Sequence, residues 1–285
     1  MQGKIVLITG ATNGIGKVAA LELAKKGATV VIVGRNRAKT EETLNEIKTK
    51  SGNPNVEMLI GDLSVLADVR RIAGEFKSKH DRLDVLVNNA GAVFASRQET
   101  ADGYEMTFAL NHLSYFLLTN LLLDVLKANA PSRIVNVSSE AHTNLALDFD
   151  DLQSKKSYAM GGFNPYGRSK LANVLFTYEL ARRLAGTGVT ANVLHPGLVA
   201  SGFGKNNPGL MNWIMNLVHL FAISEEKGAE TIVYLASSPE VEGVTEKYWD
   251  KSKAVSSSQA SYDEAAQKRL WEISEQMTGL TARVV

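Results

Sequence analysis

The sequence predicts an α/β protein with a doubly wound parallel β-sheet and helices on both faces of the sheet. Three observations lead to this prediction. Continuous β-branched runs such as residues 4–9 have the composition of strands that are buried on both faces. Helical segments of more than ten residues separate these runs, as crossover helices do between parallel strands. A glycine-rich turn directly follows the first run, where the first crossover begins.

The elements alternate along the chain in βαβ order. The predicted strands are residues 4–9, 28–33, 56–60, 83–87, 133–137, 189–194 and 245–249. The predicted helices are residues 15–26, 37–50, 66–79, 103–129, a helix around Tyr166, and residues 225–237. The chain shows no linker, repeat or low-complexity run that would divide it, so we expect one domain over residues 1–285.

Composition excludes several classes of partner. Thirty-one Lys and Arg residues balance thirty Asp and Glu residues, so no net field attracts nucleic acid or an anionic membrane. The chain has no Cys and its five His residues have no metal-ligand spacing, so we expect no metal. The first apolar run begins at Ile5, and residues 210–223 are too short to span a bilayer. We therefore expect a soluble, cytoplasmic protein without a transmembrane segment.

The turn after the first strand has the features of a dinucleotide site. It reads Thr9-Gly10-Ala11-Thr12-Asn13-Gly14-Ile15-Gly16. Glycines at 10, 14 and 16 permit a tight turn and close approach of a pyrophosphate, and the helix N-terminus behind them attracts anions. The gap between Gly10 and Gly14 is longer than the first gap of the Gly-x-Gly-x-x-Gly pattern. The alternative interpretation is that these glycines only form the turn and bind no cofactor.

The end of the second strand favours NADP(H) over NAD(H). An NAD site usually has Asp or Glu there, whereas this chain has Val33-Gly34-Arg35-Asn36-Arg37. Arg35 can form a charge-assisted pair with a 2′-phosphate. Arg37 or Lys17 could assist, or both could simply be solvated helix charges.

Tyr166 and Lys170 form a candidate acid/base pair. Residues four apart on a helix share a face, so the phenol and the ammonium would point into the same pocket. A cation at about 4 to 6 Å typically lowers an acid's pKa by about 1 to 3 units, which would bring a phenol closer to working pH. A chance pairing of a surface cation with a half-buried aromatic residue is the alternative.

Taken together, these motifs resemble the short-chain dehydrogenase/reductase family over nearly the whole chain. The resemblance rests on the glycine loop, Asp62, Asn88-Asn89-Ala90-Gly91, Asn111, Ser139, Tyr166-x-x-x-Lys170 and Pro196-Gly197. It implies the Rossmann fold and a nicotinamide cofactor. The expected cofactor-binding residues are Gly10, Thr12, Asn13, Gly14, Ile15, Gly16, Arg35, Asp62, Leu63, Asn89, Ala90, Gly91, Tyr166, Lys170, Pro196, Gly197, Val199 and Ser201, the last of which stands where Thr is typical.

The resemblance also implies a catalytic set. Ser139 would bind the substrate oxygen and Tyr166 would pass the proton. Lys170 would hold the nicotinamide ribose and lower the pKa of Tyr166, and Asn111 would place a water molecule that links Lys170 to solvent. Ser138 is the rival for Ser139, because adjacent strand residues face opposite ways.

The interval between Ser139 and Tyr166 is long for the family. With Asn111-His112-Leu113 and Leu194-His195-Pro196-Gly197, it resembles the retinol dehydrogenase and WW-domain oxidoreductase branch. That branch implies NADP(H) and a lipophilic alcohol, aldehyde or ketone, with retinal as one option. It also implies a helical substrate lid at about residues 200–223, in which Trp213, Met215, Leu217 and Phe221 line an apolar pocket or a membrane-touching rim, or else pack in the core.

Two functions remain open from the sequence. The first is an NADP(H)-dependent oxidoreductase with a small hydrophobic substrate. The second is an NADP(H)-binding sensor or scaffold without turnover. Relatives of the second kind usually lose the Tyr, Lys or Ser, and this chain retains all three. The resemblance also allows a homo-oligomer, a dimer or a tetramer, formed through the helices that carry Asn111 and Tyr166.

Overall fold

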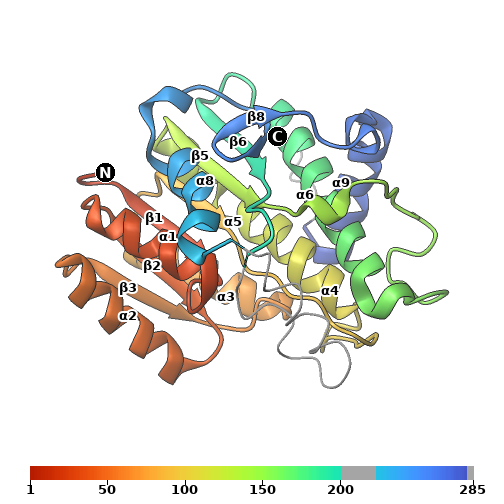
Figure 1. The fold of residues 1–285 in the computed structure, drawn as a ribbon, viewed down its shortest axis with the longest axis horizontal. Coiled ribbons are helices and arrows are strands. Elements are labelled where there is room, and N and C mark those ends of the chain that lie inside the picture. The colour runs from red at the N-terminus through yellow and green to blue at the C-terminus, as the bar shows by residue number, and fades with distance from the viewer. Residues whose placement is uncertain (200–222, 281–285) are drawn as a thin grey trace.

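The computed structural model describes residues 1–199 and 223–280, and its centre is a twisted eight-stranded sheet (Figure 1). The strand order is β3-β2-β1-β4-β5-β6-β7-β8, and every neighbouring pair is parallel except β7 with β8. The strands are β1 Ile5–Thr9, β2 Thr29–Gly34, β3 Val56–Ile60, β4 Val85–Asn88, β5 Ser132–Val137, β6 Val189–Leu194, β7 Tyr248–Asp250 and β8 Lys253–Val255. The predicted doubly wound α/β fold is confirmed.

Helices cover both faces of the sheet. The α-helices are α1 Gly14–Lys25, α2 Arg37–Ser51, α3 Leu66–Lys79, α4 Met106–Phe108, α5 Ser114–Ala128, α6 Phe163–Arg183, α8 Glu225–Ser237 and α9 Glu264–Thr278. Shorter helical turns are η1 Ala109–Leu113, η2 Glu140–His142, η3 Ala159–Gly162, η5 Pro239–Val241 and η6 Gln259–Tyr262. The predicted lid at residues 200–223, with Trp213, Met215, Leu217 and Phe221, lies outside the described residues apart from Ile223.

The alternation of side chains along β1 divides the core into two layers. Leu7 belongs to a buried cluster with residues of α3, α5, α6 and α9 on one face. Val6 and Ile8 belong to a second cluster with residues of α1, α2 and α8 on the other face. Because both sets are apolar, the strand has a continuous hydrophobic sequence, as expected of a parallel sheet covered on both faces.

Capping residues set the ends of several helices. The side chain of Asn36 accepts a hydrogen bond from the Lys39 N–H at the start of α2, at 3.0 Å. Gly52 ends that helix in the left-handed region with φ of 67°. Asp263 caps α9 by accepting hydrogen bonds from the N–H groups of Ala265 and Ala266, and Gly279 ends α9 with φ of 61°. These are the common polar start and glycine stop of helices.

The segment predicted as one helix over residues 103–129 is interrupted. It contains α4, then the π-helical turn η1, then α5. The N–H of Ser114 bonds to the carbonyl of Ala109, five residues back, so the turn is one residue wider than an α-helical turn. β8 and α9, which complete the C-terminal side of the fold, were not predicted from the sequence.

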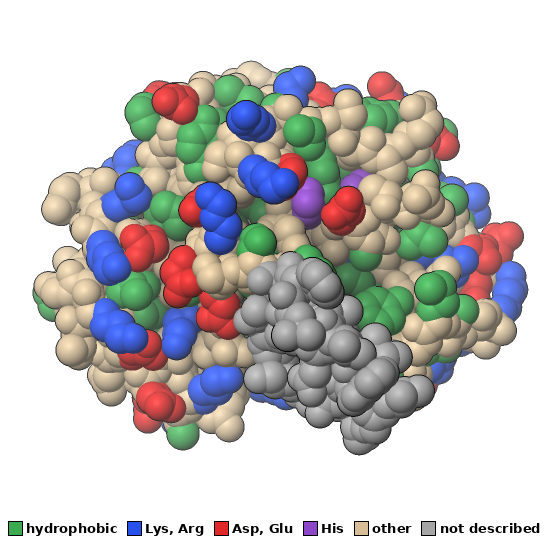
Figure 2. All heavy atoms as spheres, in the orientation of Figure 1, with side chains coloured by type: hydrophobic (Ala, Val, Ile, Leu, Met, Phe, Trp, Pro, Cys, Tyr) green, Lys and Arg blue, Asp and Glu red, His purple; other side chains and the backbone are tan. Residues whose placement is uncertain are grey.

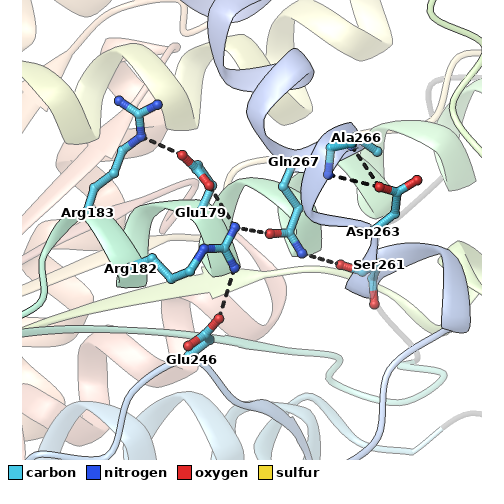
Figure 3. Close-up of polar contacts among 9 residues, drawn as sticks. Glu179, Arg182, Arg183, Glu246, Ser261, Asp263, Ala266 and Gln267 are labelled. Atoms are coloured by element: carbon cyan, nitrogen blue, oxygen red, sulfur yellow. Dashed lines mark hydrogen bonds and ion pairs between the residues drawn. The ribbon is translucent and has the colours of Figure 1, made fainter.

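A charged network fixes α9 against α6, and Figure 3 shows it. Glu179 is buried and accepts hydrogen bonds from Arg182 and Arg183, both at 2.7 Å. Arg182 also contacts Gln267 of α9 and Glu246 in the segment before β7 (Figure 3). The Arg183 guanidinium lies 4.2 Å from the centre of the Trp271 ring. Cation–π contact and paired charges thus attach the C-terminal helix to the helix that carries Tyr166.

The surface shows charges of both signs. On the face in Figure 2, Lys and Arg side chains alternate with Asp and Glu side chains over the β1–β3 side of the molecule. Among the described residues, the helical stretch Met106–Ala128 is long and apolar enough to cross a bilayer by length and composition, and 67% of its most apolar window is buried inside the protein. This stretch packs against the sheet and α6, as a core helix does.

Candidate active site

A cleft of about 690 Å³ opens at the carboxyl ends of the parallel strands. Its position at the point where the strand order reverses, between β1 and β4, is the usual ligand site of such sheets. All but one of the predicted cofactor-binding residues line it: Gly10, Thr12, Asn13, Gly14, Ile15, Gly16, Arg35, Asp62, Leu63, Asn89, Ala90, Gly91, Tyr166, Lys170, Pro196, Gly197 and Val199. Ser201 lies outside the described residues.

The loop after β1 has the shape of a phosphate cradle. Gly10 has φ of +65°, and a methyl group there would lie 2.7 Å from the Ala90 Cα. A methyl group on Gly16 would lie 2.3 Å from Nδ2 of Asn89, whose amide donates to the carbonyls of Thr9 and Gly10 at 2.9 and 3.1 Å. The loop is therefore held against the residues after β4.

The N-terminus of α1 faces this cradle. The helix begins at Gly14, and the side chain of its N-cap residue Asn13 makes no capping hydrogen bond within the described part of the chain. The N–H groups of the first turn and the positive end of the helix dipole are then available to an anion. The glycine cradle and the uncapped helix fit the pyrophosphate of a dinucleotide.

At the adenosine end, Arg35 and Asp62 lie together. The Arg35 Nη1 atom is 3.3 Å from Oδ2 of Asp62, and 75% of the Arg35 side chain is exposed. Asp62 also accepts hydrogen bonds from the N–H and the hydroxyl of Ser64, at 2.9 and 2.7 Å. The guanidinium is thus on the cleft surface with solvent access, next to the carboxylate expected to contact adenine.

The two auxiliary cations considered for the phosphate have other partners. Lys17 pairs with Glu46 of α2 at 3.2 Å. Arg37 pairs with Glu41 at 3.7 Å and lines a separate groove beside β3. These positions support the interpretation of both residues as solvated helix charges and leave Arg35 as the cation on the adenosine side among the described cleft residues.

At the opposite end of the cleft, Tyr166 of α6 faces Ser139 at the end of β5. The Ser139 hydroxyl hydrogen-bonds to the Tyr166 phenol and also accepts from the Ala141 N–H at 3.2 Å. Burial raises the pKa of Tyr166 to about 12, although the Ser139 hydrogen bond opposes this rise. Ser138 instead donates to the Lys170 carbonyl at 2.8 Å and is 2% exposed. The geometry favours Ser139 over Ser138 as the partner of Tyr166.

Lys170 lies below the phenol, one helical turn along α6. Its Nζ donates to the Val137 carbonyl at 3.0 Å and lies 5.7 Å from the ring centres of both Tyr115 and Tyr166. Burial lowers the pKa of Lys170 to about 7. The pKa of Tyr166 is thus raised in this structure, because desolvation outweighs the hydrogen bond from Ser139, and its lowering by Lys170 stays a prediction.

Asn111 lies behind Gly91, in the π-helical turn η1. Its Oδ1 accepts from the Ala92 N–H at 2.9 Å, and its Nδ2 donates to the Ala92 carbonyl and the Ser169 hydroxyl, both at 3.0 Å. A methyl group on Gly91 would lie 3.1 Å from Asn111 Oδ1 and 3.2 Å from Lys170 Nζ. Asn111 thus joins the loop after β4 to α6, directly beside the lysine.

The structure adds residues that the sequence analysis missed. Tyr115, fully buried on α5, provides the second ring beside Lys170. Its position four residues after Asn111 was the signal that could have identified it. The end of the cleft beside Tyr166 is apolar, and its lining residues are Phe94, Met106, Leu110, Phe163 and Leu198. Phe94 and Met106 come from a segment that carries no motif.

The long segment between Ser139 and Tyr166 is folded onto this apolar end. The Tyr158 hydroxyl donates to the Phe94 carbonyl at 3.0 Å and lies 3.1 Å from the Thr107 hydroxyl. A methyl group on Gly162 would lie 1.8 Å from the Phe94 carbonyl oxygen, and Gly162 has φ of +88°. The start of α6 can therefore approach Phe94 only with glycine at this position.

No group of three or more His, Cys, Asp or Glu side chains suited to a metal occurs in residues 1–199 and 223–280.

Comparison with known proteins identifies the family of the chain. Residues 4–149 match the short chain dehydrogenase family. Human retinol dehydrogenase 14 is 46% identical over 98% of this chain and 88% of its own length. Human retinol dehydrogenase 13 is 42% identical over 98% of this chain and 86% of its own length.

Solved structures show the same fold. An uncharacterized protein from Mycobacterium paratuberculosis superposes with a TM-score of 0.77 at 32% identity, covering 98% of this chain and 94% of that one. A structure from Beutenbergia cavernae, described as an NAD(P)-dependent gluconate 5-dehydrogenase with bound NADP, has a TM-score of 0.70 at 25% identity, covering 88% and 96%. The chain therefore belongs to the short-chain dehydrogenase/reductase family, in its retinol dehydrogenase-like branch, and is an oxidoreductase of the alcohol–carbonyl couple.

Proposed function

We propose that the protein interconverts a lipophilic aldehyde or ketone and its alcohol with NADP(H), and that Tyr166 transfers the proton. The observation that carries the proposal is the convergence of Ser139, Tyr166 and Lys170 at one end of a cleft whose other end is a phosphate cradle. When bound there, the nicotinamide cofactor would supply or accept the hydride. The chain has to bind both reactants, orient the carbonyl and exchange one proton.

The proton chemistry follows from the hydrogen bonds and the pKa values. In the reductive direction, Tyr166 gives its phenolic proton to the substrate oxygen, and the Ser139 hydroxyl donates a second hydrogen bond to that oxygen. The raised pKa of about 12 keeps Tyr166 protonated at neutral pH, which suits a proton donor. Lys170, with a pKa near 7, holds the ribose side of the cleft and can be protonated or neutral there. Asn111 keeps the loop after β4 in place beside it.

The preference for NADP(H) rests on Arg35. Its guanidinium is exposed at the cleft edge and can form a bidentate pair with a 2′-phosphate. The residue that ends β2 is Gly34, so no carboxylate occupies the position that accepts the ribose hydroxyls in NAD sites. The bound NADP named for the structure from Beutenbergia cavernae supports this proposal.

The substrate class rests on the apolar end of the cleft. Phe94, Met106, Leu110, Phe163 and Leu198 line the same cleft as Tyr166. A charged or polyhydroxylated substrate would lose its hydration there without gaining partners, whereas an alkyl or polyene chain would bury apolar surface. The names of the related retinol dehydrogenases support the same class.

The test is a panel of carbonyls and alcohols of increasing chain length, followed by absorbance with NADPH and with NADH. We expect turnover that prefers NADPH and improves with apolar length. Tyr166→Phe should keep cofactor binding and lose most of kcat, while Tyr234→Phe, which removes an exposed hydroxyl bonded to Glu240, should match the wild type. A preference for NADH would refute the Arg35 argument, and absence of turnover across the panel would favour a cofactor-binding sensor.

A further inference from the structure

A buried histidine outside the proposed catalytic set holds the Ser139 turn. The Nδ1 atom of His142 lies 2.7 Å from the Ser139 carbonyl oxygen, and the Ser258 N–H donates to His142 Nε2 at 3.1 Å. A carbonyl can only accept and a backbone N–H can only donate, so the ring is the neutral tautomer with its proton on Nδ1. His142 is 1% exposed, and burial lowers its pKa. Both ring nitrogens are thus fully used by two backbone segments.

A second histidine holds the opposite loop in a similar way. The Nδ1 atom of His195 accepts from the Gly197 N–H at 3.3 Å, and its Nε2 lies 3.3 Å from Oδ1 of Asp250. This gives His195 the other neutral tautomer, with its proton on Nε2. Pro196 and Gly197 line the cleft, so the ring supports the loop expected to cover the nicotinamide.

The Tyr248 ring lies between the two histidines. Its centre is 5.0 Å from the His142 ring and 5.7 Å from the His195 ring, with which it is nearly parallel at 15°. The Tyr248 hydroxyl is 3.5 Å from His142 Nδ1, at the limit of hydrogen bonding. Contacts among three rings, of which His142 and Tyr248 are buried and His195 is partly exposed, therefore connect the Ser139 turn, after β5, with the Pro196-Gly197 loop, after β6.

We propose that His142 is a positioning residue for the reaction. It fixes the Ser139 turn, and through Tyr248 and His195 it fixes the separation between Ser139 and the Pro196-Gly197 loop. This inference rests on the proposed function, because Ser139 and that loop are where the substrate oxygen and the nicotinamide would lie. Within the turn, the Ser139 hydroxyl accepts from the Ala141 N–H and the Ser139 carbonyl accepts from the His142 N–H, both at 3.2 Å. The Ser139 hydroxyl links the turn to Tyr166 of α6, and the His142 ring links it to Ser258 and to the Tyr248 ring.

The two hydrogen bonds of His142 can be removed separately. In His142→Asn, the side-chain amide nitrogen occupies approximately the place of Nδ1 and keeps the bond to the Ser139 carbonyl, but the bond from Ser258 is lost. In His142→Gln, the longer side chain reaches the place of Nε2 and its oxygen accepts from Ser258, but the bond to Ser139 is lost. His142→Ala loses both. His80→Asn is the matched control, since His80 is also largely buried but pairs with Glu57 of β3.

The experiment measures kcat, KM and cofactor affinity for these variants with NADPH and the best carbonyl of the panel. We expect His142→Gln and His142→Ala to lose on the order of 10- to 100-fold in kcat, the scale of a displacement of about 1 Å at a reacting group. His142→Asn should stay within about threefold of the wild type, as should His80→Asn, and all variants should bind NADPH with similar affinity.

A second pair of variants tests the contacts of the Tyr248 ring with His142 and His195. Tyr248→Phe retains both ring contacts and should preserve kcat, whereas Tyr248→Leu removes them and should reduce it. If kcat followed the melting temperature of the variants, or if His142→Asn lost as much as His142→Ala, the positioning role would be refuted. A wild-type protein without turnover would instead refute the proposed function, and the positioning role with it.

Discussion

Replacement of Lys170 by methionine tests the electrostatics of the site without requiring a substrate. Burial lowers the pKa of this lysine from 10.5 to about 7, and its side chain is 3% exposed. The unfolded chain therefore binds more protons than the folded chain between about pH 7 and 10.5. Under linkage, this group makes the free energy of unfolding rise with pH across that window. The charged form of the buried lysine therefore lowers the free energy of unfolding by its full amount below pH 7, and by progressively less as the pH rises above 7.

The magnitude follows from the two pKa values. Each pKa unit corresponds to about 1.4 kcal/mol, so Lys170 should contribute roughly 2 to 3 kcal/mol to the rise in unfolding free energy between about pH 6 and pH 9. Lys170→Met removes this contribution. Loss of the hydrogen bond to the Val137 carbonyl costs about 1 kcal/mol at every pH, so it lowers the whole curve without changing its slope.

The assay is urea unfolding of both proteins at several pH values from 6 to 9, with Lys227→Met as the control. Lys227 is a solvent-exposed lysine paired with Glu230 on α8, so its replacement should leave the pH profile parallel to that of the wild type. The Lys170→Met protein should gain relative stability at acidic pH. Parallel profiles for the wild type and Lys170→Met would refute the argument that the lysine is a desolvated, weakened base.

Two further predictions concern stability. Gly10 has φ of +65°, and a methyl group there would lie 2.7 Å from the Ala90 backbone, so Gly10→Ala should lower the free energy of unfolding by about 3 kcal/mol. Gly3 has a similar φ of +69° but open space around it, so Gly3→Ala should lower it by only about 1 kcal/mol. Equal losses of unfolding free energy in urea titrations would contradict the packing argument. Asp84 is buried and accepts two hydrogen bonds from Arg82 at 2.8 Å, and its pKa is lowered. Asp84→Asn should therefore cost about 3 kcal/mol at pH 7, and the loss should shrink as the pH falls below the range where the wild-type carboxylate is ionised; a loss independent of pH between 7 and 3 would argue against it.

Most of the sheet could be predicted because parallel strands covered on both faces carry an uninterrupted apolar signal. Residues 56–60 and 189–194 were predicted with the bounds that the structure has. β8 lacks this signal, since Lys253–Val255 is three residues long and exposed at the edge of the sheet. α9 did have a signal that was missed, because Asp263 and Gly279 mark its start and its stop.

The chemistry of the site could be predicted only in part. Spacing placed Tyr166 and Lys170 on one face of a helix, and the structure brings Ser139 to the same place. Sequence spacing contains no information on burial, however, so it could not predict that desolvation raises the pKa of Tyr166. The place of Phe94 in the cleft could not be predicted either, because Phe94 contacts Tyr158 and Gly162, which are more than 60 residues away in the sequence.

The π-helical turn η1 amounts to one inserted residue in an otherwise continuous helix. Deletion of a residue from 109–113 would restore regular α-helical hydrogen bonding, and it would rotate α4 by about 100° relative to α5. Leu110 and Asn111 would then leave their places beside the cleft, although every side chain of the core half of α5 could remain buried. Helical regularity and an intact active site are therefore competing demands on this segment, and any grafting or shortening of it has to treat the extra residue as part of the site.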